Sequence, residues 1–273
     1  MTDLYAVIGN PVGHSKSPAI HAEFAKQTGQ DMDYRAILSP LDGFPETVES
    51  LRREGFRGCN VTVPFKFEAF TCSNSRSERA EIARAVNTLK FEEGRVYGDN
   101  TDGAGLVADI RKNLQVPIEN KRILLAGAGG AAWGVLFPLL MEMPASLVIS
   151  NRTIAKAEEA VRILSKIEKR GSTSFSAMAF DKLAGSQFDI VINATSSGLK
   201  DELPLLPEGL FPKGSLAYDM MYGRKTPFMK FAEEQGASIV SDGLGMLVEQ
   251  AAESFFVWRG VRPETKPVID KLR

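Results

Sequence analysis

Three small residues in a glycine-rich stretch have the spacing of a dinucleotide-binding turn. Gly127, Gly129 and Ala132 match the pattern GxGxxA, and they follow a short apolar run at residues 122–126. Such a turn lets backbone amides approach a pyrophosphate, and the N-terminus of the following helix adds partial positive charge. Glycine turns are common, so the pattern alone also fits a tight turn that binds nothing.

The residues that follow the next predicted strand favour NADP over NAD. An NAD-binding unit usually has an acidic side chain there, which accepts hydrogen bonds from the ribose 2′-hydroxyl. This chain instead has Asn151, Arg152 and Thr153, with Lys156 one helical turn later. Arg152 can pair with a 2′-phosphate through its planar fork, and Lys156 adds a second positive charge. A solvated surface arginine is the ordinary alternative.

An enzyme that uses NADPH to reduce a ketone by hydride transfer needs more than a cofactor site. It also needs a proton donor and groups that orient the substrate. Ser15 and Ser17 flank a predicted helix start, where hydroxyls and free amides form a ready carboxylate site. A simple N-cap role for Ser17 and a turn role for Ser15 explain the same two residues.

Further polar candidates lie at the end of a predicted strand and in two turn-like segments. Asn60 and Thr62 alternate along the strand and would point to one face, with Lys66 shortly after it. Asn87 and Asp102 come from the turn-like segments. Lys66 on its own would more often be a solvated surface lysine.

Short β-branched runs alternate with helical patterns almost from end to end, which predicts an α/β fold with parallel sheets built from βαβ units. The predicted strands are residues 5–8, 58–64, 122–126, 147–150, 189–192 and 216–219. The predicted helices are residues 17–29, an apolar stretch that follows the turn at 127–132 and runs to about 141, and residues 154–169 and 244–259. The first helix would have Ser17 as N-cap and Gly29 as its stop, and Gly260 would end the last one. The units from residue 122 onward are typical of a doubly wound nucleotide-binding domain.

Composition narrows the class of protein further. A chain of 273 residues is long enough for two domains, and 33 basic against 34 acidic side chains give no broad basic field. Nucleic acid and membrane are therefore not expected partners. The chain opens without a secretory signal pattern, and no apolar run approaches 18 residues, so we expect a cytoplasmic protein.

Cysteine and histidine are too scarce to predict a metal site. Cys59 and Cys72 lack the spacing of a redox or zinc motif, and His14 and His21 have no cysteine nearby. We therefore expect free thiols and no metal.

A series of motifs, in order along the whole chain, resembles shikimate dehydrogenase. They are GNP at 9–11, HSKSP at 14–18, NVTVPFK at 60–66, AVNT at 85–88, GDNTDG at 98–103, GAGGA at 127–131, NRT at 151–153, NATSSG at 193–198, YDMMY at 218–222 and DGLGMLV at 242–248 with Gln250.

The resemblance implies reversible reduction of 3-dehydroshikimate to shikimate with NADPH, in the pathway to chorismate and the aromatic amino acids. Lys66 and Asp102 would form the catalytic pair, with Lys66 exchanging the proton. The implied substrate-binding residues are Ser15, Ser17, Asn60, Thr62, Lys66, Asn87, Asp102, Tyr222 and Gln250. The implied NADP-binding residues are Glu78, Gly127, Ala128, Gly129, Gly130, Ala131, Asn151, Arg152, Thr153, Lys156, Thr195, Ser196, Met220 and Gly243.

The resemblance also implies the domain organisation. Residues 1–102 and 240–273 would form the substrate-binding, catalytic domain, and residues 103–239 a Rossmann-like NADP-binding domain. Three residues depart from the pattern: Trp133 beside the expected pyrophosphate, Lys156 in place of an arginine, and Phe67 directly after Lys66.

Two rival functions stay open. A quinate/shikimate dehydrogenase would use NAD and a saturated ring, and Arg152 with Lys156 argues against it. A catalytically inactive sensor of NADPH or shikimate would not need both Lys66 and Asp102. A monomer and a homodimer both fit the sequence.

Overall fold

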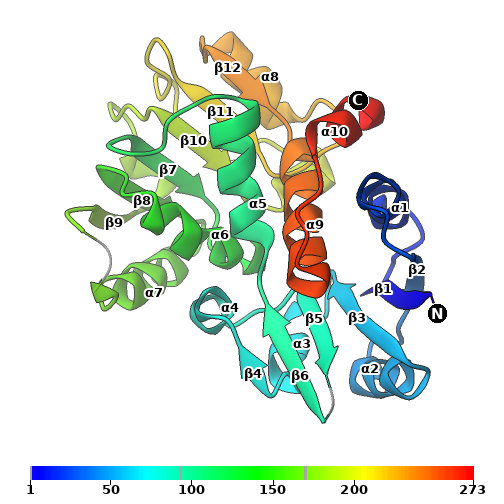
Figure 1. The fold of residues 1–273 in the computed structure, drawn as a ribbon. Helices are drawn as coiled ribbons and strands as arrows, with labels where there is room; N and C mark the ends of the chain where they lie inside the picture. The colour runs from blue at the N-terminus through cyan, green and yellow to red at the C-terminus, as the bar shows by residue number, and fades with distance from the viewer. Residues whose placement is uncertain (1, 93, 169–170) are drawn as a thin grey trace. The chain divides into compact units, whose positions relative to one another are not determined.

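The computed structural model describes residues 2–92, 94–168 and 171–273, which divide into two compact units. Unit 1 comprises Met1–Gly105 and Leu247–Arg273, and unit 2 comprises Leu106–Met246. Both units combine helices with a sheet, so the predicted α/β class is confirmed (Figure 1). The C-terminal helices belong to unit 1, as predicted.

The sheet of unit 1 is mixed rather than parallel. Its strands are β1 (Asp3–Gly9), β2 (Met32–Leu38), β3 (Phe56–Val61), β4 (Ser75–Arg76), β5 (Thr88–Glu92) and β6 (Arg95–Asp99), in the order β2-β1-β3-β5-β6-β4. β5 runs antiparallel to both β3 and β6, so the prediction of parallel sheets throughout is wrong here. The segments around Asn87 and Asp99, which looked like turns, adjoin this β5–β6 hairpin, whose charged residues hide its strand pattern.

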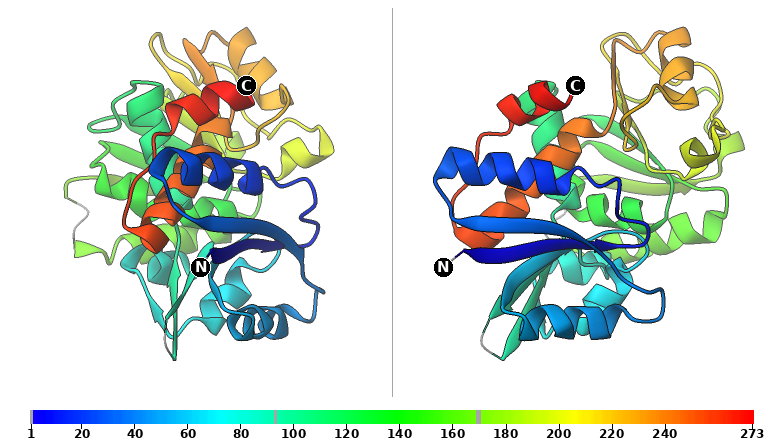
Figure 2. Two further views of the ribbon diagram at one scale, coloured as in Figure 1. Left: turned by 45° about the vertical axis from the view of Figure 1, so that its right-hand side comes forward. Right: turned by 90° about the vertical axis from the view of Figure 1, so that its right-hand side faces the viewer.

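Helices cover both faces of the unit 1 sheet. They are α1 (Ser17–Thr28), α2 (Phe44–Arg53), α3 (Lys66–Cys72), α4 (Glu78–Ala83), α10 (Lys266–Leu272) and the part of α9 (Leu244–Arg259) from Leu247 onward. α1 and α2 lie on opposite sides of β1 and β2 (Figure 2). Alternate residues of β1 serve the two faces, since Ile8 packs with Phe44 of α2 while Tyr5 packs with Trp258 of α9.

The start of α1 differs from the prediction. Lys16, not Ser17, is the N-cap residue, and Ser17 is already helical. The Ser15 hydroxyl accepts a hydrogen bond from the Ser17 amide at 3.2 Å, so the local side-chain contact comes from Ser15 instead. The predicted stop is confirmed, because Gly29 has the left-handed φ of 65° that glycine tolerates best.

Unit 2 contains a fully parallel six-stranded sheet. Its strands are β7 (Arg122–Ala126), β8 (Ser146–Ser150), β9 (Ser174–Met178), β10 (Ile190–Asn193), β11 (Leu216–Asp219) and β12 (Ile239–Ser241), in the order β12-β11-β10-β7-β8-β9. Numbered within the unit, this is the 3-2-1-4-5-6 order of dinucleotide-binding folds. The doubly wound domain predicted from the sequence is therefore confirmed.

Alternate strand residues of unit 2 build a core on each face of the sheet. Its helical segments are α5 (Asp102–Ala108, from Leu106 onward), the π-helical turn Asp109–Asn113, α6 (Gly130–Met141), α7 (Ile154–Leu164), α8 (Pro227–Glu234) and the 3-10 turns Phe180–Lys182 and Ser197–Lys200. Leu125 faces the core of α6 and α7, whereas Leu124 faces that of α8. Burial on both faces explains the continuous apolar runs.

The helix predicted over 154–169 is too long. α7 ends at Leu164, and Ser165 bonds the Val161 carbonyl with both its amide and its hydroxyl, a local pairing that favours the end of a helix. The predicted end at Lys169 lies outside the described residues.

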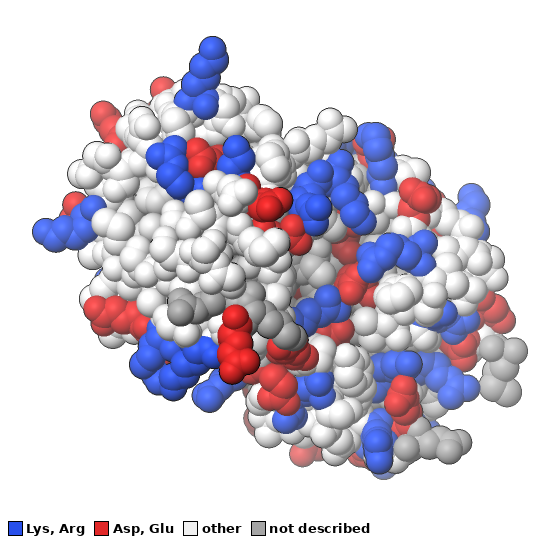
Figure 3. Space-filling model, turned by 60° about the vertical axis from the view of Figure 1, so that its left-hand side comes forward, with Lys and Arg blue, Asp and Glu red and all other residues white. Residues whose placement is uncertain are grey.

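Acidic and basic side chains are interspersed on the molecular face drawn in Figure 3, in keeping with the nearly balanced totals of 33 basic and 34 acidic residues.

Across residues 2–92, 94–168 and 171–273, none of the helices combines the length and hydropathy that crossing a bilayer requires.

A histidine is buried in an aromatic cluster of unit 1. His21 is fully buried and stacks on Tyr34 with 4.2 Å between ring centroids. Within the described residues, neither ring nitrogen has a hydrogen-bond partner. Burial lowers the pKa of His21 from 6.5 to about 3, because the apolar surroundings disfavour the imidazolium.

His21 should therefore make the fold sensitive to acid. Below pH 6.5 the imidazole of His21 is protonated in the unfolded chain but stays neutral in the folded chain. The contribution of His21 to the unfolding free energy is therefore fully present above pH 6.5 and is lost as the pH decreases toward 3. From pH 7 to pH 5 the wild type should lose about 2 kcal/mol more unfolding free energy than His21→Phe, measured by urea unfolding. Equal losses in the two proteins would contradict the assignment.

The glycine turn after β7 gives a second stability prediction. Gly127 has φ +116°, and a Cβ there would lie 2.8 Å from the Ala194 carbonyl oxygen, whereas a Cβ at Gly129 would meet nothing within 4 Å. Gly127→Ala should lower the unfolding free energy by roughly 1–3 kcal/mol, and the matched Gly129→Ala by less than roughly 1 kcal/mol. Thermal unfolding of both variants would check this, and an undisturbed Gly127→Ala would refute the close approach.

Candidate functional site

Lys66 is held in place by its neighbours at the start of α3. The preceding Phe65 is fully buried and stacks on Phe44, with ring centroids 5.0 Å apart. The Lys66 carbonyl accepts a hydrogen bond from the Val86 amide at 2.9 Å. The backbone of Lys66 is thus anchored to the core of unit 1, while its side chain keeps 22% of its surface exposed.

The Lys66 side chain ends on Asp102, the first residue of α5. Lys66 Nζ lies 2.5 Å from Asp102 Oδ2, and the Asp102 side chain is only 9% exposed. Asn87 Nδ2 donates to the other carboxylate oxygen, Oδ1, at 2.8 Å. Both oxygens of Asp102 therefore have hydrogen-bond partners. The Lys66 amino group is held at a fixed, partly exposed position, where it can give up a proton as the ammonium or take one up as the amine.

Asn87 is itself fixed by a polar network. Its side-chain oxygen accepts from the Thr101 amide at 2.8 Å, and its nitrogen also donates to Gln250 Oε1 at 3.1 Å. Asn60 lies beneath it, 6% exposed, with its oxygen bonded to the Tyr34 hydroxyl at 2.7 Å. The structure thus brings together Lys66, Asp102, Asn87 and Gln250, while the polar atoms of Asn60 are already bonded to neighbours.

The ion pair between Arg79 and Asp99, which the sequence analysis did not predict, stabilises the turn that precedes Asp102. Arg79 donates to both oxygens of the buried Asp99 at 2.7 and 2.6 Å. Although burial opposes the charged form, hydrogen bonds and charge pairing with Asp99 and Glu253 raise the pKa of Arg79. Asp99 also accepts from the Asn100 amide at 2.7 Å, which fixes the turn before Asp102. The presence of Asp99 three residues before Asp102 is the feature of the sequence that could have pointed to this ion pair.

The remaining candidates in unit 1 lie at the starts of two helices and just after the end of a strand. Ser15 and Ser17 are at the start of α1, where Ser17 is buried and Ser15 half-buried. Thr62 follows β3 and is half-buried, with its methyl group against Gly9. Glu78 is the first residue of α4 and is exposed.

In unit 2, the carboxyl ends of four strands are in register. The paired terminal residues are Ser150, Ala126, Asn193 and Asp219, which end β8, β7, β10 and β11. The strand order reverses direction between β7 and β10, and parallel sheets bind ligands at such a switch point. A residue larger than glycine at 127 would fill this point, since its Cβ would meet Ala194.

The glycine turn and the segment after β8 are connected at this edge. The Ala128 amide donates to Asn151 Oδ1 at 3.2 Å, and α6 begins at Gly130 after Gly129 as N-cap. Arg152, Thr153 and Lys156 are exposed. Neither Arg152 nor Lys156 has an acidic partner among the residues that the structure describes, so both charges are available to an anion.

The loops after β10, β11 and β12 bring the other unit 2 candidates to the same edge. Thr195 is half-buried beside exposed Ser196. Gly243 allows a close approach, because a Cβ there would collide with the Met220 carbonyl. Tyr222, predicted to bind substrate, comes from this unit, and burial raises its pKa.

The three departures from the family pattern have different surroundings. Trp133 is half-buried and packs against the core that α6 shares with the sheet. Phe67 is 54% exposed, next to Lys66, and nothing in the structure explains it. Lys156 is exposed in the first turn of α7.

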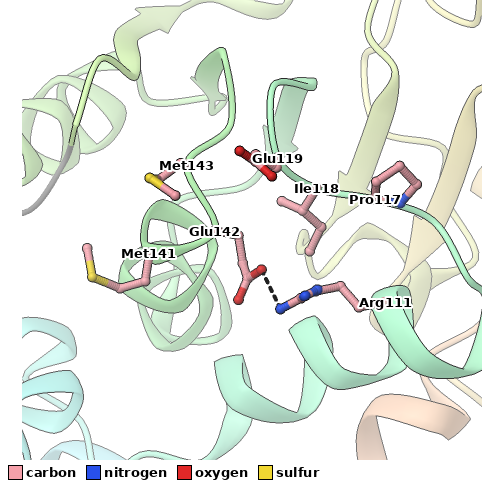
Figure 4. A pocket seen from close by; sticks show the side chains of 7 residues that line it. All are labelled: Arg111, Pro117, Ile118, Glu119, Met141, Glu142 and Met143. Carbon is pink, nitrogen blue, oxygen red and sulfur yellow. Dashed lines mark ion pairs between the residues drawn. The ribbon is translucent and has the colours of Figure 1, made fainter.

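A pocket elsewhere in unit 2 is unconnected with these candidates. Figure 4 shows Arg111 and Glu142 paired across it, between Met141–Met143 at the end of α6 and Ile118–Glu119 ahead of β7. It therefore lies where the strands begin, whereas the glycine turn is where they end. Among the described residues, no group of three or more His, Cys, Asp or Glu is arranged to hold a metal ion.

Family models match three stretches of the chain. Residues 7–89 match the shikimate dehydrogenase substrate binding domain, residues 109–200 match shikimate / quinate 5-dehydrogenase, and residues 243–273 match the shikimate 5'-dehydrogenase C-terminal domain.

Individual relatives match the full length. Shikimate dehydrogenase (NADP(+)) of Nitrosospira multiformis is 58% identical over 274 residues, covering 100% of this chain and 98% of the relative. The structure of an Ael1 enzyme from Pseudomonas putida has a TM-score of 0.94 at 48% identity, covering 99% of this chain and 98% of that one. Shikimate 5-dehydrogenase from Thermus thermophilus, in complex with NADP(H) and shikimate, has a TM-score of 0.86 at 33% identity, covering 98% of both chains. The chain belongs to the shikimate dehydrogenase family.

Proposed function

We propose that this chain catalyses the reversible reduction of 3-dehydroshikimate to shikimate with NADPH. The single observation that carries the proposal is the Lys66–Asp102 ion pair, 2.5 Å long and braced by Asn87 at 2.8 Å. A lysine held in this way can exchange a proton at the reacting oxygen. Membership of the family supplies the reaction to which that chemistry belongs.

In the proposed mechanism, the chain's own residues handle the proton and orient the ring. NADPH, when bound, supplies the hydride that reduces the carbonyl carbon. Lys66 gives its proton to the carbonyl oxygen as negative charge grows there, and Asp102 keeps the ammonium aimed at it. In the reverse direction, Lys66 takes the proton back from the shikimate hydroxyl.

The other predicted substrate residues are proposed to fix the ring. Ser15 and Ser17 would hold the carboxylate through their hydroxyls, near the N-terminus of α1. Asn87, Gln250, Thr62 and Tyr222 would bind ring hydroxyls or close around them. Asn60 is proposed to support Asn87 rather than to bind the ring directly, since its polar atoms are already bonded to Tyr34, Asn87, Thr88 and Ser254.

Unit 2 has the features that an NADP-binding domain needs. The proposed pyrophosphate site is the Gly127–Ala131 turn, where the strand order reverses and α6 begins. Arg152 and Lys156 would bind the 2′-phosphate, and no carboxylate stands at 151–153 to repel it. Thr195, Ser196, Met220, Gly243 and, from unit 1, Glu78 are proposed for the rest of the cofactor.

These roles define the proposed domains, partners and location. Unit 1 would be the substrate-binding, catalytic domain and unit 2 the NADP-binding domain, with shikimate and NADP(H) as small-molecule partners. A cytoplasmic location is proposed because Cys59 and Cys72 are free thiols, as is usual in a reducing compartment. Sedimentation of the purified chain would distinguish a homodimer from a monomer.

An absorbance assay tests the proposed function directly. Purified protein with shikimate and NADP should produce NADPH, and replacing shikimate by quinate or NADP by NAD should give much slower turnover. Comparable rates with quinate and NAD would identify the broader quinate/shikimate enzyme. Cofactor or shikimate binding without any turnover would identify a sensor and contradict the proposal.

Replacement of the lysine tests the proton role. Lys66→Ala should lower kcat by roughly 10²- to 10⁴-fold, the span expected for loss of a general acid, with a much smaller change in shikimate affinity. Steady-state kinetics and shikimate titration would measure the two effects. Lys90→Ala, which removes an ion pair with Glu92 in the β5–β6 hairpin, is the matched control. Turnover retained in Lys66→Ala would transfer the proton role to another group.

Replacement of the arginine tests the cofactor preference. Arg152→Asp should weaken NADPH binding by roughly 10- to 100-fold, because a charge-assisted hydrogen bond becomes a repulsion, and should change NADH binding much less. Arg162→Asp, in the helix that follows, is the control and should leave both affinities alone. Equal loss of the two cofactors in Arg152→Asp would disprove a 2′-phosphate contact.

A further inference from the structure

Two buried polar residues lie at the ends of neighbouring strands in the unit 2 sheet. Asn193 ends β10 and Asp219 ends β11, and their Cα positions are register partners. Asn193 is 1% exposed and Asp219 is fully buried. Burying an amide and a carboxyl group in this position is costly unless both are hydrogen-bonded, so their partners indicate what the pair is for.

Asn193 holds the loop after β10. Its side-chain oxygen accepts from the Thr195 amide at 3.1 Å and from the Thr195 hydroxyl at 2.7 Å. Its nitrogen donates to Asp219 Oδ2 at 3.2 Å. The orientation of the Asn193 amide group is therefore fixed by Asp219, and this orientation in turn fixes Thr195.

Asp219 holds the loop after β11. Its Oδ1 accepts from the Met221 amide at 3.0 Å, and its Oδ2 accepts from the Thr226 hydroxyl at 2.5 Å. The Met221 carbonyl then accepts from the Gly243 amide at 2.8 Å, which connects the loop after β12. Burial raises the pKa of Asp219, while the hydrogen bonds that it accepts favour its charged form.

We propose that Asn193 and Asp219 form a positioning pair that sets the cofactor-binding loops at Thr195 and at Met220–Met221 without contacting the cofactor. The inference rests on the proposed cofactor roles of Thr195, Met220 and Gly243. Each partner is specified by the other, because an amide nitrogen at 193 needs an acceptor at 219. The pair therefore controls NADPH affinity through the two loops that it holds.

An exchange of the two side chains tests the pair as a unit. Asp219→Asn sets two amide nitrogens facing each other, and Asn193→Asp sets two carboxylates facing each other. In the double variant, an acceptor at 193 again faces a donor at 219. Each single variant should raise the NADPH dissociation constant by roughly 10-fold, and the double variant should recover most of that loss. NADPH fluorescence titration measures this without turnover.

A milder pair of variants keeps the test decisive if the single exchanges do not fold. Thr226→Val removes the hydroxyl that bonds Asp219, and Thr226→Ser restores it. Thr173→Val is the matched control, since it removes a similarly buried hydroxyl bond of 2.7 Å to the Pro144 carbonyl, ahead of β8. Thr226→Val should weaken NADPH binding by roughly 3-fold or more, with recovery in Thr226→Ser and no change in Thr173→Val.

The outcomes separate this inference from the proposed function. Variants that unfold more easily yet bind NADPH as the wild type does would overturn the positioning role, and so would a double variant no better than the singles. A wild type that binds NADPH but does not oxidise shikimate when NADP is supplied would defeat the proposed function, while the positioning test would still apply.

Discussion

The candidate chemistry depends on one constraint, the ion pair between Lys66 and Asp102. A carboxylate that is 9% exposed is costly unless it is fully bonded, and here an ammonium and the Asn87 amide occupy its two oxygens. Asn87 is fixed by Thr101 and Gln250, and the turn before Asp102 is fixed by Asp99 with Arg79. The polar interior of unit 1 thus supports a single lysine whose side chain keeps a partly open surface.

Unit 2 also satisfies its buried polar groups by hydrogen bonds, but it does so at the ends of a parallel sheet. Strands β7, β8, β10 and β11 are apolar along their length apart from Tyr218, so their other polar residues lie at the strand ends, and the register of these strands collects the C-terminal ones at one edge. Asn193 and Asp219 satisfy each other and the loops beyond them. The geometry of the loops at this edge is therefore set by hydrogen bonds to residues at the ends of the strands.

The sequence predicted best those elements whose pattern is local. β7, β11 and α9 have the predicted bounds, because a buried parallel strand is a continuous apolar run and Gly260 ends the helix. The β5–β6 hairpin was missed because its exposed charges hide the strand pattern, and the N-cap of α1 shifted because Ser15 bonds the Ser17 amide. The meeting of Lys66 with Asp102 followed from a family resemblance, and the Asn193–Asp219 and Arg79–Asp99 pairs are contacts across strands or loops that no local spacing encodes.

The central claim is that Lys66 and Asp102 act together on the reacting oxygen. A crystal structure of the wild type with shikimate and NADP bound tests it most directly. We expect the shikimate hydroxyl that is oxidised to lie within hydrogen-bond distance of Lys66 Nζ, with the ion pair to Asp102 still formed. A substrate bound with that hydroxyl beyond the reach of Lys66, and contacted by another proton donor, would contradict it.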